Sequence, residues 1–147
     1  MNIVIREAAE TDVPYLTLLS NQLGYPVDES NTRKNLLAIR EKGDGNVYVA
    51  TENNKPVAWM HIAKRTTLES GSMFEILGFV VDEACRGKGI GSILLEKAID
   101  WCRERNASSL RVRSNIKRNE AHRFYTERGF TLKKEQKVFE MKLDNCS

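Results

Sequence analysis

Residues 78–98 read GFVVDEACRGKGIGSILLEKA, and this stretch decides the fold. Its first residues are apolar and β-branched, which predicts a strand, whereas residues 90–98 carry apolar side chains at helical spacing. The loop between them holds Arg86, Gly87, Lys88, Gly89 and Gly91. A helix N-terminus offers unpaired backbone N–H groups, and glycines let that backbone approach an anion closely. The stretch therefore predicts a phosphate or pyrophosphate site, whereas a plain strand-to-helix turn would need only one glycine.

Two common phosphate-binding motifs do not match this loop. The Rossmann fingerprint G-x-G-x-x-G needs a third glycine one residue after Gly91, where Ser92 stands. The P-loop needs Ser or Thr directly after its lysine, but Lys88 is followed by Gly89. Both the dinucleotide and the nucleoside triphosphate interpretations of the loop therefore fail.

The composition is typical of one globular domain, which we expect to span residues 1–147. With 23 basic and 20 acidic residues, the net charge of +3 is too balanced to indicate a nucleic-acid partner. The N-terminus lacks the apolar core of a signal peptide, and no run reaches membrane-spanning length, so we expect a cytoplasmic protein without a membrane partner. Cys85, Cys102 and Cys146 form no CxxC pair, so neither a disulfide framework nor a metal site is expected.

Hydrophobic periodicity divides the chain into alternating strands and helices. Strands are expected at residues 2–8, 71–81 and 108–115, a hairpin at 46–65 around Asn53-Asn54, and a closing hairpin at 130–143. Helices are expected at 9–24, 28–43, 90–104 and 119–129, the second burying Leu36, Leu37 and Ile39. The order β-α-α-β-β-β-α-β-α-β-β predicts an α/β fold, a mixed and mostly antiparallel sheet of about seven strands flanked by about four helices.

Three pieces of the chain, in this order, resemble the GNAT N-acetyltransferase superfamily. Arg86, Gly89 and Gly91 match the R-x-x-G-x-G of its acetyl-CoA loop, and EILGFVV at residues 75–81 precedes the loop at the family's spacing. Residues 114–130, SNIKRNEAHRFYTERGF, are similar to its later segment, with an asparagine, a Phe-Tyr pair and a closing Gly-Phe. The resemblance implies an N-acetyltransferase that moves an acetyl group from acetyl-CoA to a primary amine by direct attack in a ternary complex.

Two shorter segments indicate a class of enzymes within this family. QLGYP at residues 22–26 and RSNIKRNEAHRFY at 113–125 look most like small-molecule amine acetyltransferases, including those of aminoalkylphosphonates. Many members of the family are dimers, so the resemblance also implies a homodimer. Three alternatives stay open: an acetyltransferase of protein N-termini or lysines, a non-catalytic acyl-CoA sensor on the same fold, and a nucleic-acid-binding module built on the basic residues between 103 and 118.

By this resemblance, acetyl-CoA is held on both sides of the glycine loop. The implied contacts are Phe79, Val80 and Val81 in the strand, Arg86, Gly87, Lys88, Gly89, Ile90, Gly91 and Ser92 in the loop, and Asn115, Asn119 and Tyr125 beyond it. Asn119 is equally suited to cap the helix that follows it. Gly78 interrupts the strand, which predicts a bulge or a close approach by another group. A bulge would free backbone groups for the pantetheine arm, whereas the alternative is a glycine that makes room for a packed helix.

The reaction needs a base and an acid, because an ammonium group with a pKa of about 10.4 must lose a proton and the leaving thiolate gains from receiving one. The resemblance implies Glu75 as the base, acting directly or through water. The alternative is a carboxylate that faces solvent or pairs with an arginine. Tyr125 is implied as the acid, and its alternative is a core aromatic residue.

The acceptor amine is expected on the opposite side of the sheet from the coenzyme. Its candidate contacts are Tyr25, Asp28 and Glu29 between the first two helices, Glu69 after the third strand, and His61 within that strand. Acidic residues there would attract a cationic amine, although they could equally be ordinary solvated charges. His61 could line the pocket, act as a second base or be a satisfied strand histidine.

Overall fold

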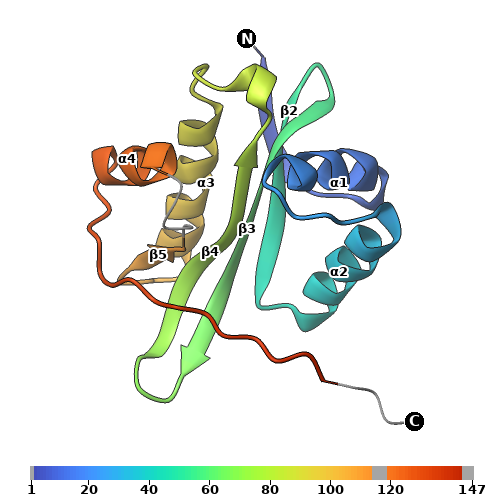
Figure 1. Cartoon of the computed structure of the whole chain (residues 1–147). Helices are drawn as coiled ribbons and strands as arrows, with labels where there is room; N and C mark the ends of the chain where they lie inside the picture. The colour runs from blue at the N-terminus through green and yellow to red at the C-terminus, as the bar shows by residue number, and fades with distance from the viewer. Residues whose placement is uncertain (1, 114–118, 144–147) are drawn as a thin grey trace. The chain divides into compact units, whose positions relative to one another are not determined.

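The computed structural model describes residues 2–113 and 119–143, and the chain divides into two compact units, residues 1–113 and 114–147 (Figure 1). The first unit contains five strands, β1 (Ile3–Glu7), β2 (Gly45–Glu52), β3 (Lys55–Thr67), β4 (Gly71–Val81) and β5 (Leu110–Val112). Its α-helices are α1 (Val13–Gln22), α2 (Glu29–Lys42) and α3 (Ile90–Glu104). None of the helices in the described ranges is long and apolar enough to cross a membrane.

The strands form one sheet in the order β1-β2-β3-β4-β5. The first three pairings are antiparallel and join neighbours in the chain, whereas β4 and β5 pair in parallel. A parallel pair needs a crossover connection, and α3 supplies it. Helices α1 and α2 lie on one side of the sheet and α3 on the other, as Figure 1 shows. The order through β5 agrees with the sequence expectation.

Local signals fix most of the helix ends and turns. Asp28 caps α2 by accepting a hydrogen bond from the Asn31 N–H at 2.8 Å, and Gly43 ends that helix in the left-handed conformation, with φ of 70°. Asn53 and Asn54 both have positive φ, as the tight turn between β2 and β3 requires. The bounds of α2 and the turn at Asn53-Asn54 match the sequence expectations, whereas the capping role of Asp28 was not expected.

The core on the α1 and α2 side is a cluster of apolar side chains. It comprises Ala8, Val13, Leu16, Leu36 and Val49, with Val47 and Trp59 packed against it. The expectation that Leu37 is buried was wrong, because it is 42% exposed. One residue advances a helix by about 100°, so burying Leu36 turns its neighbour outward.

The core on the α3 side is built by the inner face of that helix. Its buried side chains are Ile90, Leu94, Leu95, Ala98, Trp101 and Cys102. The indole of Trp101 meets the ring of Phe74 edge to face, with centroids 5.1 Å apart. This contact anchors α3 on β4, the strand that leads into the glycine loop.

The second unit contains α4 (Asn119–Glu127), which ends at Gly129 with φ of 93°. The expected closing hairpin is a correction: residues 130–143 carry no strand, so the described sheet has five strands instead of about seven. The alternating Phe139, Met141 and Leu143 are each at least 79% exposed. Alternating apolar residues show which face a strand would bury, but a strand also needs hydrogen-bond partners for its backbone. This segment contains no clear turn signal that would form a hairpin and supply them.

An ion pair ties β1 to the turn before α1. The guanidinium of Arg6 donates to both oxygens of Asp12, at 2.7 and 2.8 Å, and the Ala9 N–H donates to one of them at 2.7 Å. Burial on its own would raise the pKa of Asp12. The hydrogen bonds from Arg6 and Ala9 outweigh burial, so the pKa of Asp12 lies below its usual range.

Asp12 should therefore give the protein an acid-sensitive stability. Because the pKa is lower in the folded state, the stabilisation is present above the unfolded value of about 3.9 and is lost as the pH falls through the folded value. We expect Asp12→Asn to lower the free energy of unfolding by about 2 kcal/mol at pH 7 and to flatten its decline below about pH 4. Urea unfolding between pH 7 and pH 3 measures both, with Asp100→Asn on the exposed side of α3 as control. An unchanged acid decline in Asp12→Asn would contradict this role.

Candidate active site

The glycine loop joins β4 to α3 in an open conformation. After β4 the chain makes a short 3₁₀ turn, Glu83–Cys85, and then passes Gly87 and Gly89, each with φ of 83°. This left-handed conformation favours glycine, and the place of a Cβ at both positions is open space. Gly89 is the N-cap of α3 and has no side chain to cap it. The first turn of α3 therefore presents its backbone N–H groups without a side-chain cap from this position.

Charge and exposure around the loop suit an anion. Arg86, Gly87, Lys88 and Gly89 are all exposed, whereas Ile90 is 1% exposed and anchors the start of the helix. The Arg86 Nε donates to the Val81 carbonyl at 3.4 Å, which holds its side chain beside the end of β4. The helix dipole adds a partial positive charge at the same place. The loop can therefore bind a phosphate group through backbone and side-chain donors.

Sequence reasoning missed the residue that fastens this loop. Gln22, at the end of α1, accepts a hydrogen bond from the Glu83 N–H at 3.0 Å and donates to the Asp82 carboxylate at 3.3 Å. Asp82 in turn accepts from the Ala84 N–H at 3.1 Å. The contacts span about sixty residues of sequence, so no local pattern could reveal them. They join α1 to the start of the loop.

The strand before the loop contains a bulge. Ile62 pairs with Ile76 but His61 pairs with Gly78, so Leu77 is an extra residue on β4. A Cβ at Gly78 would lie 2.6 Å from two ring carbons of Trp59. The structure thus shows both a bulge and a close approach at Gly78, and the approaching group is an indole from the neighbouring strand.

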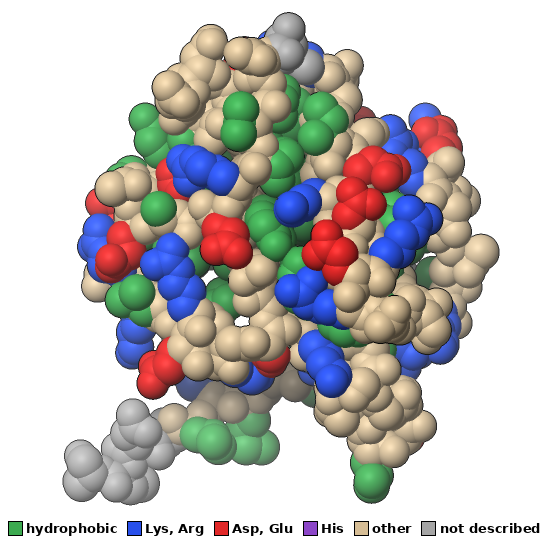
Figure 2. Space-filling model, turned by 180° about the vertical axis from the view of Figure 1, so that it is seen from behind, with side chains coloured by type: hydrophobic (Ala, Val, Ile, Leu, Met, Phe, Trp, Pro, Cys, Tyr) green, Lys and Arg blue, Asp and Glu red, His purple; other side chains and the backbone are tan. Residues whose placement is uncertain are grey.

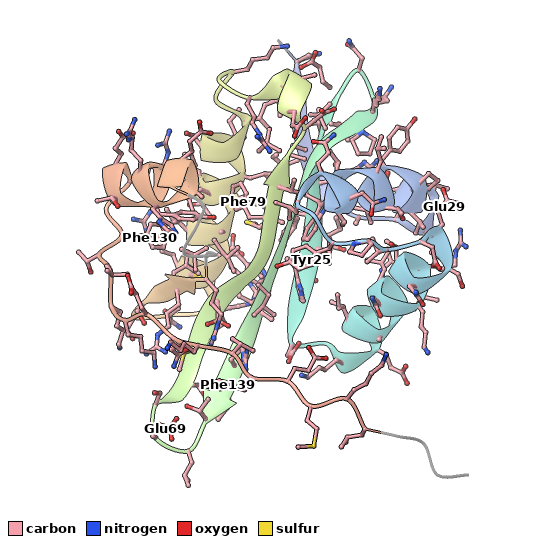
Figure 3. The ribbon with its side chains drawn as sticks, in the orientation of Figure 1. Tyr25, Glu29, Glu69, Phe79, Phe130 and Phe139 are labelled. Carbon is pink, nitrogen blue, oxygen red and sulfur yellow. The ribbon has the colours of Figure 1, made fainter. Side chains whose placement is uncertain are left out.

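The pairing of β4 with β5 lies before the bulge. β5 pairs with β4 only at Phe74, Glu75 and Ile76, and none of the described residues forms a strand beside Phe79–Val81 on that side. The register turns Val80 toward Trp59 and Phe79 toward the α3 side, where Figure 3 labels it. The three residues expected to contact the coenzyme through their backbone therefore lie beyond the bulge, where β3 is the strand beside β4 in the described parts of the chain.

Glu75 is buried between two arginines. It is 1% exposed, and its two oxygens accept hydrogen bonds from Arg65 Nη1 at 3.2 Å and from Arg113 Nε at 3.0 Å. The arginine-paired alternative for this carboxylate is therefore what the geometry shows. Any amine that reaches Glu75 must approach through water or displace a guanidinium.

The expected acceptor residues do not form one cluster. Asp28 caps α2, Glu29 is the first residue of that helix, and Tyr25 is 62% exposed in the connection before it. Glu69 lies in the exposed turn between β3 and β4, at the far tip of that hairpin in Figure 3. These acids are therefore separate loop charges, with one used as a helix cap.

His61 lies directly opposite Gly78, on the same face of β3 as Trp59. Burial lowers the pKa of His61, Asp44 raises it and Lys42 lowers it, with a net downward shift. The imidazole is therefore neutral near pH 7, when it can accept a proton or a hydrogen bond. Among the acceptor candidates, His61 is the one at the bulge.

The remaining expected residues belong to the second unit. Tyr125 is 9% exposed, and its ring meets Phe130 edge to face with centroids 5.7 Å apart. Asn119 is the first residue of α4, and Asn115 lies outside the described residues. In the described ranges, His, Cys, Asp and Glu side chains gather nowhere in a group of three that could hold a metal ion.

The charges on the far face of the molecule are mixed. Figure 2 shows Lys and Arg side chains interspersed with Asp and Glu over this face. A nucleic-acid-binding surface is expected to concentrate positive charge along one stripe. This face therefore gives no support to the nucleic-acid alternative.

Comparison with known proteins agrees with this geometry. The sequence model of the Acetyltransferase (GNAT) family matches residues 12–130. YhdJ of Bacillus subtilis, described as an uncharacterized N-acetyltransferase, is 30% identical over 78% of this chain and 81% of its own length. An aminoalkylphosphonate N-acetyltransferase of Salmonella typhimurium is 34% identical over 77% of this chain and 71% of its own.

A solved structure of the same family shows the fold. A GNAT family acetyltransferase of Staphylococcus aureus has a TM-score of 0.78 at 23% identity, with 96% of this chain and 100% of that chain covered. At this identity, the similarity is evidence for the fold alone.

The close approach of Trp59 to Gly78 predicts that even a methyl group added at position 78 will destabilise the protein. We expect Gly78→Ala to lower the free energy of unfolding by about 2 kcal/mol, because its Cβ overlaps the Trp59 ring. Trp59→Leu removes that ring, so Gly78→Ala in the Trp59→Leu background should cost much less. Urea unfolding of the four proteins in this double-mutant cycle measures the coupling. Additive effects would show that the overlap does not determine the choice of glycine.

Proposed function

Because the chain belongs to the GNAT acetyltransferase family, we propose that it transfers an acetyl group from acetyl-CoA to the primary amine of a small molecule. The observation that carries this proposal is the open glycine loop at the start of α3, with Gly87 and Gly89 in the left-handed conformation. The family match spans residues in both units of the chain, so we infer that the two units work as one catalytic domain.

In this proposal, the loop holds the pyrophosphate of acetyl-CoA. The backbone N–H groups from Gly87 to Ser92 donate to it, and Arg86 and Lys88 supply charge. By resemblance to the family, the backbone of Phe79–Val81, directly beyond the bulge, binds the pantetheine arm. Asn115 and Asn119 are proposed contacts by resemblance to the family.

The proposed chemistry is direct transfer. The amine loses a proton, its nitrogen attacks the thioester carbonyl carbon, and the carbon–sulfur bond breaks. Glu75 is the proposed base and acts through water, because Arg65 and Arg113 cover its oxygens. Tyr125 is the proposed acid that gives a proton to the leaving thiolate, and His61 lines the acceptor side of the bulge.

One relative supports a small acceptor over a protein. The Salmonella relative is named for aminoalkylphosphonates, which are small primary amines. We therefore place the amine of a small molecule first and the N-terminus or lysine of a protein second. A panel of short amines and a lysine-containing peptide, each offered with acetyl-CoA, separates the two classes.

Coenzyme binding tests the basis of the proposal. We expect calorimetric titration to show saturable binding of acetyl-CoA, with no binding of NAD or ATP. Gly89→Glu should weaken the binding at least about tenfold, because it adds a carboxylate where an anion binds and strains a left-handed position. Gly43→Glu is the matched control, since Gly43 also has positive φ and open space around its Cβ position but ends α2. If wild type binds ATP or NAD instead, the loop holds another anion.

Tyr125 can be tested separately from binding. Tyr125→Phe removes the phenolic proton and keeps the ring, so we expect kcat to fall by about 100-fold while the Kd of acetyl-CoA stays the same. Steady-state kinetics and calorimetry measure the two quantities, with Tyr15→Phe in α1 as control. An unchanged kcat in Tyr125→Phe would remove this residue from the mechanism.

A further inference from the structure

The indole of Trp59 covers the bulge of β4 on the α1 and α2 side of the sheet. Trp59 pairs with Val80 across the two strands, and Gly78 lies two residues before Val80 on the same face. The place of a Cβ on Gly78 lies 2.6 Å from Cζ3 and 2.6 Å from Cη2, two carbons of the six-membered ring of Trp59. A long aromatic side chain can reach such a diagonal neighbour. The ring therefore extends from β3 over the backbone of Gly78.

Space, and not backbone conformation, explains the glycine at this position. Gly78 does not have the positive φ that favours glycine. Gly89 in the loop differs, because it has positive φ and open space at its Cβ position. Trp59 and Gly78 therefore form a matched pair, in which the missing side chain of one residue makes room for the ring of the other.

Packing holds the indole in this place. Trp59 is partly exposed and packs against the buried apolar cluster on the α1 and α2 side. Its indole N–H is buried and has no hydrogen-bond partner in the described parts of the chain. An unpaired donor does not help to fix the ring, so the position of the ring is set by its shape and its neighbours. The indole is thus an apolar wall at the bulge.

The proposed reaction brings the acceptor to this wall. The glycine loop opens α3 on the other side of the sheet, and the backbone directly beyond the bulge is the proposed contact of the pantetheine arm. The thioester at the end of that arm is then attacked from the side of Trp59, which is also the side of Glu75 and His61. The reacting nitrogen therefore reaches the thioester past the ring of Trp59.

We propose that Trp59 determines specificity by limiting the bulk of the acceptor beside its reacting nitrogen, so that the substrate is a primary amine on a slender, unbranched chain. This inference rests on the proposed acetyltransferase function. A ring in a close-packed cluster yields little to an inserted group, so a branched or cyclic chain next to the CH₂–NH₂ group overlaps the indole. A smaller side chain at position 59 leaves space there and widens the range of acceptors.

Three primary amines that share a CH₂–NH₂ group test the proposal. Propylamine is unbranched, 2,2-dimethylpropylamine is branched and cyclohexylmethylamine carries a ring. With wild type, we expect kcat/KM for propylamine to exceed the values for both bulky amines by at least about tenfold. In Trp59→Leu, kcat/KM for the bulky amines should rise, so that the preference falls to about one. Trp59→Phe has a shorter ring and should give an intermediate preference.

Matched variants separate the shape of the site from a general loss of packing. Trp101→Leu makes the same change on the α3 side, where Trp101 contacts Phe74, and should keep the preference of the wild type. In the Trp59→Leu background, Gly78→Ala puts a methyl group into the vacated space and should restore part of the preference. Thermal unfolding checks that each variant is folded. Trp59→Phe keeps an aromatic ring in the cluster, so it tests the proposal even if Trp59→Leu is unstable.

The outcomes distinguish this inference from the proposed function. If the protein does not bind acetyl-CoA, the proposed function fails and the inference fails with it. If wild type acetylates all three amines equally, the function stands and the role of Trp59 is overturned. The role is also overturned if the preference survives in both Trp59 variants, or if Trp101→Leu relaxes it as much as Trp59→Leu does.

Calorimetry decides the case in which wild type acetylates none of the three amines. Each amine is then titrated into the CoA-bound wild type and the CoA-bound Trp59→Leu and Trp59→Phe variants. Tighter binding of a bulky amine to a Trp59 variant than to wild type supports the proposal. Equal binding, or no binding to any of these proteins, overturns it.

Discussion

The indole of Trp59 occupies the space that a side chain at position 78 would fill, and the layout of the site depends on this contact. In a regular strand, residues 75 and 78 would point to opposite faces because their separation is odd. The extra residue, Leu77, restores the same face to both. Glu75, Gly78 and His61 therefore share one side of the sheet, while Phe79 faces the other. The one inserted residue thus brings Gly78, beneath the ring of Trp59, to the same face of the sheet as Glu75.

The two charged regions at the ends of β4 are built differently. At the loop, the backbone N–H groups at the start of α3 and the side chains of Arg86 and Lys88 provide the positive potential. At Glu75, the positive charge comes from Arg65 on β3 and Arg113 just after β5, which both donate to one buried carboxylate. The acidic acceptor contacts expected from the sequence, Asp28, Glu29 and Glu69, stay predictions. The first of these caps a helix and the last lies in the turn between β3 and β4, so they belong to different elements.

How much could be predicted from the sequence depends on the range of the interactions. Features set by a few neighbouring residues were predicted correctly, including the span of α3, the Asn53-Asn54 turn and the ends of α2. The Glu75 contacts reach ten and thirty-eight residues away, and those of Gln22 about sixty, so no local pattern reveals them. The prediction of a closing hairpin was wrong because the alternating apolar residues at 139–143 indicate only which face of a strand would be buried. They do not show that a partner strand is present. The roles of Glu75, Tyr125 and the coenzyme contacts stay predictions.

The chain has two tryptophans, and the fold places one on each side of the sheet. Trp59 lies over Gly78 at the bulge, and Trp101 packs edge to face on Phe74 beneath α3. Both indole N–H groups are buried and have no hydrogen-bond partner in the described parts of the chain. The wavelength of indole fluorescence depends on the polarity around the ring. Each side of the sheet therefore contains one intrinsic fluorescent probe. With Trp101 replaced by phenylalanine, the intrinsic fluorescence would report events at the bulge alone.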